Sequence, residues 1–249
     1  MSLTDQELER YARHIVLKEI GGAGQMRLKA ARVLVIGAGG IGSPAIQYLA
    51  AAGVGAIWII DDDRVDLSNL QRQTLFTVAD IGQRKVSAAK ARAHAINPHI
   101  EVHAVLDRIE PQNVDFVRDY DVVLDGTDNF ATRLLVADAA LRHRVPLVSA
   151  AVGEFEGQLG VFRGWEADKP CYRCFTGGDP ETPGINCAEQ GVLGALTGVL
   201  GSLAALEVIR SIVPFGEDSA GKLLLADTLA LRFRTLTLPK DPGCPACGV

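Results

Sequence analysis

Hydrophobic residues in the first 151 positions form short runs, separated by longer stretches in which apolar positions recur with helical spacing. Short apolar runs are typical of buried strands, and the longer amphipathic stretches are typical of helices. Regular alternation of the two predicts an α/β, Rossmann-like fold, a mostly parallel sheet with helices on both faces. The predicted strands are 32–36, 57–60, 100–106, 121–124 and 147–151, and the clearest helices are 83–96 and 129–144.

The pattern changes after residue 152. Residues 176–186 read as a Gly/Pro-rich loop, and further strands are predicted at 158–163, 222–226 and 231–238. We therefore expect two regions of one overall domain, with N-terminal helices and the Rossmann-like part in 1–152 and a β-rich part in 153–249. At the N-terminus, Thr4 and Glu7 have capping-box spacing, which predicts a helix to about residue 17 that carries Arg13.

The apolar stretch 191–206 is shorter than the roughly 20 residues that a membrane span requires. Glu207 and Arg210 follow on the same predicted helix, so we expect a buried helix and no membrane association. Glycines recur along it at helical spacing, which predicts a core or subunit contact with close backbone approach. These glycines are Gly191, Gly194, Gly198 and Gly201.

Charge and composition narrow the classes of partner. The net charge is −5 and basic residues are scattered, so no electrostatic footprint for nucleic acid is present. The N-terminus lacks the basic start and apolar run of a signal peptide, which predicts a cytoplasmic protein with reduced cysteines.

A glycine-rich turn follows the first predicted strand, with Gly37, Gly39 and Gly42 in Gly-x-Gly-x-x-Gly spacing. Small residues there let backbone amides and a helix N-terminus approach a phosphate. Asp61 ends the next strand, where an acid can bind ribose hydroxyls. Taken alone, this pattern favours a dinucleotide oxidoreductase.

The polar residues that follow change that estimate. Arg72 in the run 68–73 and Lys85 at a helix start place cations near the predicted phosphate site, and Asp128 follows another strand, where a carboxylate can hold Mg²⁺. A polyphosphate approached by a carboxylate needs such neutralising charges. Singly, each has an ordinary structural alternative: Arg72 in a surface salt bridge, Lys85 as a solvated lysine, Asp128 as a helix N-cap.

Four of the five cysteines form two Cys-x-x-Cys pairs, Cys171 with Cys174 and Cys244 with Cys247. Four thiolates suit a closed tetrahedral zinc site, which predicts a structural metal rather than a redox dithiol. Cys187 is left over before the long apolar helix, and we keep two interpretations of it open, a reactive thiolate and a small packing residue.

Taken in order, Gly-Ala-Gly-Gly-Ile-Gly, Asp61, Ser-Asn-Leu-Gln-Arg-Gln, Lys85, Thr-Asp-Asn and the cysteine pairs resemble the E1-like MoeB/ThiF (HesA/MoeB/ThiF) family of sulfur-carrier protein adenylyltransferases. The resemblance implies that ATP and Mg²⁺ bind the Rossmann-like region. It also implies that the Gly-Gly carboxylate of a ubiquitin-fold sulfur carrier attacks the α-phosphate, leaving an acyl-adenylate and pyrophosphate. Region 153–249 would then be a zinc-binding crossover and carrier-binding region.

The resemblance also implies roles for individual residues. Asp61 would bind ribose, Arg72 and Lys85 would hold phosphates, and Asp128 would bind magnesium. Arg13 would reach the phosphates in the neighbouring subunit of a homodimer. The nucleotide-contacting set would be Gly37, Gly39, Gly40, Gly42, Asp61, Ser68, Asn69, Leu70, Gln71, Arg72, Lys85, Asp128 and Asn129. In the family, a cysteine placed like Cys187 joins covalently to the carrier in some members and is dispensable in others.

Several alternatives stay open. With no further sulfurtransferase domain after residue 249, sulfur would come from a separate sulfurtransferase or cysteine desulfurase. The overall resemblance favours molybdopterin over thiamin synthesis, although both carriers end in Gly-Gly. Three other classes are less consistent with the residues. The intact set of Arg13, Arg72, Lys85 and Asp128 argues against a non-catalytic scaffold. No proton relay supports an NAD-dependent oxidoreductase, and no basic tract supports a tRNA-modifying enzyme.

Overall fold

The computed structural model describes residues 2–177 and 191–248 and contains one eight-stranded sheet, in the order β3-β2-β1-β4-β5-β6-β7-β8. Strands β1 to β5 pair in parallel, and β6, β7 and β8 continue the sheet antiparallel. This confirms the mostly parallel α/β prediction. The strands are β1 Arg32–Ile36, β2 Ala56–Ile60, β3 Glu101–Val105, β4 Val122–Asp125, β5 Leu147–Gly153, β6 Glu156–Phe162, β7 Lys222–Asp227 and β8 Arg232–Thr237.

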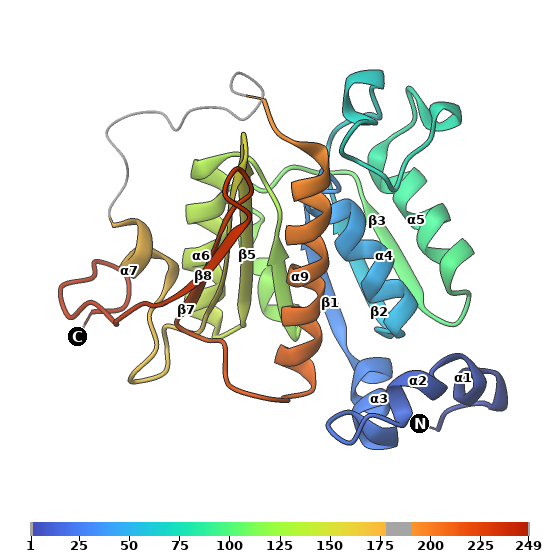
Figure 1. The fold of residues 1–249 in the computed structure, drawn as a ribbon, viewed down its shortest axis with the longest axis horizontal. Helices are drawn as coiled ribbons and strands as arrows, with labels where there is room; N and C mark the ends of the chain where they lie inside the picture. Colours follow the sequence, from blue (N-terminus) through green and yellow to red (C-terminus); the bar gives the residue numbers. More distant parts are fainter. Residues whose placement is uncertain (1, 178–190, 249) are drawn as a thin grey trace.

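Helices cover both faces of the sheet (Figure 1). Helices α4 (Gly42–Ala52), α5 (Lys85–Ile96) and α9 (Gly194–Ile212) pack on one face and form the larger apolar cluster. Helix α6 (Phe130–His143), the 3-10 helix η3 (Val114–Asp119) and α7 (Tyr172–Thr176) cover the other. The remaining helices are α1 Asp5–Arg10, α2 Ala12–Ile15, α3 Gly21–Ala30, η1 Leu67–Asn69 and η2 Val78–Asp80.

The strand order reverses between β1 and β4, because β1 lies beside β2 on one side and beside β4 on the other. In open α/β sheets, ligands bind outside the carboxyl ends of the strands at such a switch point. The turns that follow β1, β2 and β4 therefore lie where a nucleotide site is expected.

The N-terminal segment differs from the prediction of one helix to residue 17. Thr4 and Glu7 do form the capping box of α1, but the helix ends at Tyr11 and resumes as the short α2, which carries Arg13. The Tyr11 side chain is buried, its hydroxyl accepts a hydrogen bond from Asn97 Nδ2 (2.8 Å), and this contact directs the residue into the core. Helix α3 was not predicted.

Helix α9 is long and apolar enough to cross a membrane by length and composition. One side of it is buried against α4 and strands β4, β5 and β6, as a core helix requires. The predicted close approach holds for two of its glycines: a Cβ on Gly194 would lie 2.2 Å from Gln71 O, and one on Gly201 would lie 2.4 Å from Ile41 O. A Cβ on Gly198 would meet nothing within 4 Å in this chain, so Gly198 makes no core contact, and the subunit contact stays a prediction.

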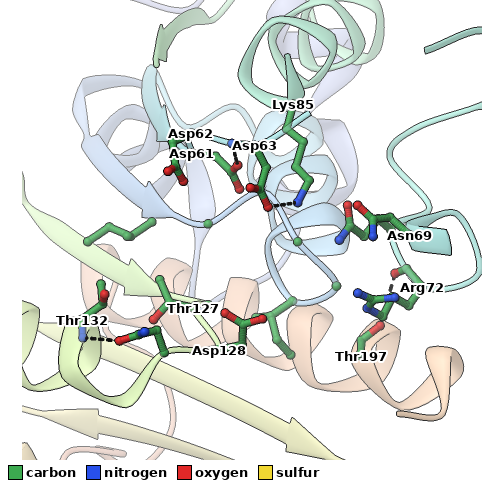
Figure 2. A pocket seen from close by; sticks show the side chains of 18 of the residues that line it. Asp61, Asp62, Asp63, Asn69, Arg72, Lys85, Thr127, Asp128, Thr132 and Thr197 are labelled. Carbon is green, nitrogen blue, oxygen red and sulfur yellow. Dashed lines mark hydrogen bonds and ion pairs between the residues drawn. The ribbon is translucent and has the colours of Figure 1, made fainter. Parts of the chain in front are cut away.

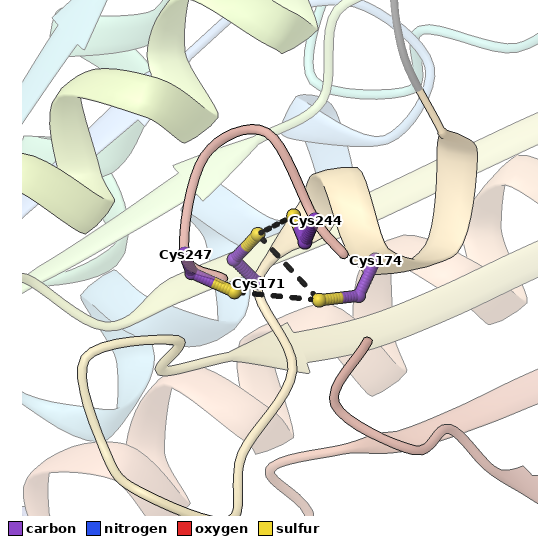
Figure 3. A group of neighbouring side chains, drawn as sticks. All are labelled: Cys171, Cys174, Cys244 and Cys247. Carbon is purple, nitrogen blue, oxygen red and sulfur yellow. Dashed lines mark hydrogen bonds between the residues drawn. The ribbon is translucent and has the colours of Figure 1, made fainter. Parts of the chain in front are cut away.

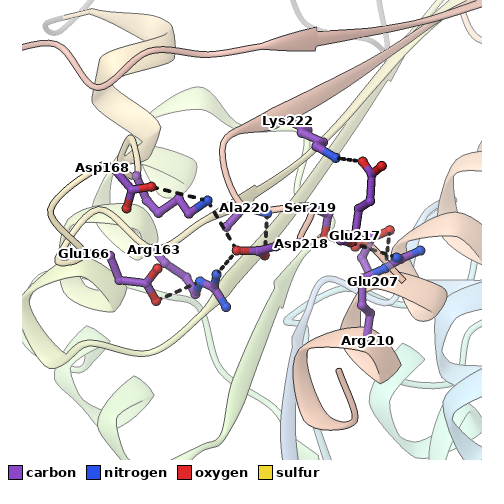
Figure 4. Close-up of polar contacts among 11 residues, drawn as sticks. Arg163, Glu166, Asp168, Glu207, Arg210, Glu217, Asp218, Ser219, Ala220 and Lys222 are labelled. Atoms are coloured by element: carbon purple, nitrogen blue, oxygen red, sulfur yellow. Dashed lines mark hydrogen bonds and ion pairs between the residues drawn. The ribbon is translucent and has the colours of Figure 1, made fainter. Parts of the chain in front are cut away.

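An ionic network joins the end of α9 to the loops around β6 and β7 (Figure 4). Asp218 accepts from Arg163 and lies 3.3 Å from Lys169 Nζ. Nearby, Glu207 on α9 pairs with Arg210 (3.3 Å) and accepts a hydrogen bond from Ser219 Oγ. These contacts fix the connection that leads from α9 into the antiparallel part of the sheet.

Candidate active site

A cavity of about 590 Å³ opens at the carboxyl ends of β1, β2 and β4 (Figure 2). Its volume is within the range of roughly 300–1,000 Å³ found for small-molecule sites. It collects most of the residues that the sequence motifs indicated. Those lining it are Gly37, Gly39, Gly40, Asp61, Ser68, Asn69, Gln71, Arg72, Lys85, Asp128 and Asn129.

The glycine turn between β1 and α4 is tightly packed. Gly37 has a φ of +88°, a backbone conformation that favours glycine. A Cβ on Gly42 would lie 2.0 Å from Gly37 O, so this glycine closes the turn rather than lining the cavity. A Cβ on Gly40 would lie 2.9 Å from Thr197 Cγ2 on α9. The turn therefore holds its amides and the start of α4 against the cavity, as phosphate binding requires.

An acidic segment follows β2 on one side of the cavity. Asp61 accepts hydrogen bonds from the backbone N–H of Ala38 and of Asp63, both at 2.8 Å. Burial raises the pKa of Asp61, although the charge of Lys85 opposes that shift. Lys85 is itself only 4% exposed, and its Nζ lies 2.8 Å from Asp63 Oδ2. The interpretation of Lys85 as a solvated helix lysine is therefore wrong.

The loop that carries Arg72 is positioned by α9. Thr197 Oγ1 donates to Gly194 O (2.7 Å) and lies 3.3 Å from Arg72 O, so the first turn of α9 contacts the loop backbone. Arg72 Nη1 donates to Ser68 O (3.2 Å), which holds the guanidinium against the loop that lines the cavity. Figure 2 shows Asn69 and Arg72 on one side of the cavity and the acidic segment with Lys85 on another.

The turn after β4 supplies Asp128 and Asn129. Asn129 is the N-cap of α6, since its Oδ1 accepts from Thr132 N (3.0 Å). Asp128 is therefore not the helix cap, and the structural alternative for it is wrong. Instead Asp128 is exposed and lines the cavity beside Thr127.

Some predicted residues lie elsewhere. Arg13 does not line this cavity, because α2 lies near the end of the sheet where β1 begins (Figure 1). Leu70 packs against the apolar core. Cys187 lies outside the described residues. Polar cavity residues that sequence reasoning did not assign to the site are Asp62, Asp63, Gln73, Asp107, Arg108, Thr127, Thr132, Arg133 and Thr197. Of these, Gln73 closes a recognised motif, and Arg133 and Thr197 carry no local signal.

The four paired cysteines gather where the C-terminal turn meets the start of α7 (Figure 3). The Sγ atoms of Cys171 and Cys244 are 3.5 Å apart, those of Cys174 and Cys247 are 3.4 Å apart, and those of Cys171 and Cys174 are 3.8 Å apart. Four thiolates bonded to one Zn²⁺ at about 2.3 Å have sulfur atoms separated by about 3.8 Å. The donor set and spacing therefore fit a closed structural zinc site.

The thiols differ in acidity without a metal. Burial raises the pKa of Cys171. Burial acts in the same direction on Cys244, but the backbone N–H groups of Ala246 and Cys247 outweigh it and lower the pKa of Cys244 to about 7. A metal ion stabilises all four thiolates together, which the buried cluster cannot do by itself.

Comparisons with known proteins agree with this geometry. The chain is 45% identical, over 100% of its length and 93% of the relative's, to a sulfur carrier protein adenylyltransferase of Thermus thermophilus. It is 43% identical to the molybdopterin-synthase adenylyltransferase of Escherichia coli, over 99% of this chain and 98% of that protein. A crystal structure of Escherichia coli MccB with ATP has the same fold, with a TM-score of 0.83 and 23% identity over 98% of this chain and 75% of that one.

The family resemblance seen in the motifs is confirmed at the level of the whole chain. The glycine turn, the acid after β2, the 68–73 loop and the first three of the paired cysteines all lie within one matched region. The model of the ThiF family matches residues 11–246, and the chain therefore belongs to the ThiF family.

Proposed function

We propose that the protein adenylates the C-terminal glycine of a ubiquitin-fold sulfur-carrier protein at the expense of ATP. A carboxylate oxygen of the carrier forms a bond to the α-phosphorus. The bond from that phosphorus to the oxygen bridging to the β-phosphorus breaks, and pyrophosphate leaves with the electron pair. The product is an acyl-adenylate that a sulfur donor can attack.

One observation carries the proposal: Asp61, Arg72, Lys85 and Asp128 line the same cavity at the switch point of the sheet. Asp61 is suited to the ribose hydroxyls, and the two cations to the phosphates. A carboxylate is already ionised, so in-line placement and charge neutralisation matter more than a general base. In agreement, no histidine is among the lining residues that the structure describes.

We infer that Asp128 holds Mg²⁺ together with phosphate oxygens of ATP. Magnesium in such sites binds one or two carboxylates and substrate phosphates, and a single exposed acid is therefore sufficient. When bound, Mg²⁺ neutralises charge on the phosphates and assists departure of pyrophosphate. The carboxylates of residues 61–63 also lie within 4.8 Å of one another, but Lys85 pairs with Asp63 and lowers the demand for a cation there.

We infer further that the active form is a homodimer in which Arg13 serves the cavity of the second subunit. Mixing Arg13→Ala with Lys85→Ala protein tests this. A randomly mixed pool is half hybrid dimers, each with one complete site, so about a quarter of wild-type activity should return. If Arg13 acts on its own chain's cavity, the mixture stays inactive.

We assign region 153–249 to carrier binding and to the structural zinc. For Cys187 two roles stay open, a thiol that takes part in sulfur transfer and a small packing residue. A separate sulfurtransferase or cysteine desulfurase supplies sulfur in a cytoplasmic pathway. Synthesis of molybdopterin is favoured over that of thiamin, because a molybdopterin-synthase adenylyltransferase is among the full-length relatives.

The test is ATP–pyrophosphate exchange with Mg²⁺, with and without a carrier ending in Gly-Gly. We expect exchange that depends on the carrier and disappears when its last glycine is removed. Comparing the molybdopterin and thiamin carriers decides the pathway. No exchange with either carrier contradicts adenylation and favours the scaffold or oxidoreductase alternatives.

A further inference from the structure

Thr127 lies in the turn between β4 and α6, and two buried side chains hold all three of its polar atoms. Its backbone N–H and its hydroxyl both donate to Asp125 Oδ1, over 3.0 Å and 2.7 Å. Its backbone carbonyl accepts a hydrogen bond from Arg133 Nη2. One residue of the cavity wall is therefore fixed at three points, by the last residue of β4 and by a residue of α6.

Asp125 and Arg133 are among the few acidic or basic side chains that the structure buries. Asp125 has no solvent exposure and Arg133 is 8% exposed. Burying such groups is costly unless internal hydrogen bonds replace water. Asp125 Oδ2 accepts one bond from Ser149 Oγ (3.3 Å), and the other two that this carboxyl receives come from Thr127. Adenylation as proposed above gives neither side chain a task, so their shared contact with Thr127 needs its own explanation.

The residues beside Thr127 leave the turn little freedom. Gly126 N donates to Ile36 O (3.0 Å), and a Cβ on Gly126 would lie 3.1 Å from Ile41 Cγ2, so the turn already packs against the glycine turn. On the other side of Asp128, Asn129 caps α6. Figure 2 shows Thr127 and Asp128 next to each other on the cavity wall. The backbone of Asp128 is therefore held between two fixed neighbours, while its side chain is exposed.

We propose that Asp125 and Arg133 are positioning residues of the magnesium site: by fixing Thr127 they fix the backbone from which Asp128 reaches the cation. Magnesium demands a nearly ideal octahedral geometry, so a carboxylate that is displaced or mobile binds it less well. Asp125 and Arg133 touch neither ATP nor metal in this role. The part of the inference that concerns magnesium rests on the proposed function, whereas the part that concerns the turn does not.

The first test removes one contact and keeps the shape of the side chain. Thr127→Val lacks the hydroxyl that donates to Asp125, whereas Thr127→Ser retains it. Thr228→Val is the matched control, because Thr228 Oγ1 also donates over 2.7 Å in a turn, to Phe155 O, and does not line the cavity. In protein without nucleotide, the amide of residue 127 should exchange with solvent about tenfold faster in Thr127→Val and at the wild-type rate in the other two variants.

The second readout isolates the cation. Equilibrium binding of ATP is measured with Mg²⁺ and again with EDTA. Thr127→Val should weaken binding about tenfold with Mg²⁺ and leave it unchanged with EDTA. In a double-mutant cycle, Thr127→Val should cost almost nothing when Asp128→Asn is already present, since both act on the same cation. Equal losses with and without Mg²⁺, or fully multiplicative losses in the cycle, would overturn the proposal.

Arg133→Met attacks the same turn from α6 and serves as a second, independent variant. It should give the same loss that depends on Mg²⁺ and the same faster exchange at residue 127. A loss of ATP affinity in EDTA would show instead that the guanidinium binds the nucleotide itself, which contradicts a positioning role for Arg133. Lower thermal stability of both variants, with amide exchange and ATP affinity unchanged, would reduce these contacts to ordinary support of the fold.

The outcomes distinguish this inference from the proposed function. Amide exchange at residue 127 requires neither ATP nor a carrier, and it tests the turn directly. If wild-type protein catalyses no carrier-dependent pyrophosphate exchange while Thr127→Val still loosens the turn and weakens binding of ATP with Mg²⁺, the proposed function fails and the positioning role stands. If pyrophosphate exchange is normal and neither variant changes the turn, the positioning role fails alone.

Discussion

Two glycines on α9 should respond in opposite ways to the same substitution. Gly201 faces the start of α4, where an added Cβ would lie 2.4 Å from Ile41 O and 2.4 Å from Pro44 Cγ. Gly198 is one turn away, and an added Cβ there would meet nothing within 4 Å. Gly201→Ala should therefore destabilise the protein and Gly198→Ala should stabilise it.

The magnitudes follow from two terms. Alanine is favoured over glycine inside a helix by about 1 kcal/mol, and this gain applies to both sites. At Gly201 the new Cβ would lie about 1 Å closer to Ile41 O and to Pro44 Cγ than the ordinary contact of 3.4 Å. Because one of these neighbours is a backbone atom, we expect overpacking to lower the free energy of unfolding by about 3 kcal/mol. The net effects are a gain of about 1 kcal/mol for Gly198→Ala and a loss of about 2 kcal/mol for Gly201→Ala.

Thermal unfolding at matched zinc content and protein concentration measures this difference. For a domain of this size, about 3 kcal/mol between the two variants corresponds to roughly 6–12 °C in Tm. Ile41 directly precedes the Gly42 turn, so Gly201→Ala should also weaken ATP binding, whereas Gly198→Ala should leave it unchanged. Equal Tm values for the two variants would show that the packing between α9 and α4 is not as close as described.

Three other perturbations give further tests. Lys85→Ala should lower carrier-dependent pyrophosphate exchange by about 100-fold through loss of phosphate stabilisation, while Lys90→Ala on the exposed side of α5 should not; equal effects would remove Lys85 from the site. Removing the metal with a chelator under reducing conditions should lower Tm, and zinc analysis should give about one equivalent per chain; an unchanged Tm would refute a structural metal. Burial alone raises the pKa of Asp218, but the Ala220 N–H and the charges of Arg163 and Lys169 outweigh it, so the net pKa is lowered. Asp218 therefore stabilises the fold above its usual pKa of 3.8, and this contribution is lost as the pH falls through the lowered value. The difference in unfolding free energy between wild type and Asp218→Asn, measured by urea denaturation, should shrink below pH 3.8; a constant difference would contradict this.

Strong local signals made much of the fold predictable. Strand β1 was predicted at its observed bounds, and α6 to within a residue at each end, because a buried apolar run and an Asn cap are encoded locally. Helix α3 was missed because it contains three glycines, which disfavour helix. One of them, Gly24, is needed for packing: a Cβ there would lie 2.8 Å from Val213 Cγ1 beyond the end of α9. Helix α3 therefore depends on a tertiary contact, which a local sequence pattern cannot show.

The site divides in the same way. Residues next to strand ends, such as Asp61 and Asp128, could be predicted because the carboxyl ends of parallel strands gather in one place. Thr197 and Arg133 could not, since α9 and α6 bring them to the cavity only after the sheet has formed. The position of the cavity could therefore be predicted from the topology of the sheet. The residues that form its walls could not all be predicted, because some come from segments far apart in the sequence that meet only through packing.

The cysteine cluster has a consequence for how the end of the chain is retained. It joins residues 73 positions apart, and closing a loop of that length restricts the unfolded chain by about 4 kcal/mol on a chain-entropy estimate. The last strand, β8, has all six residues exposed and contributes little burial of its own. Metal coordination by the four cysteines would therefore take the place of a hydrophobic anchor for this strand. Loss of the metal would leave an unpaired, partly apolar sheet edge free to associate with other chains, so metal starvation should first appear as aggregation rather than as a slower reaction.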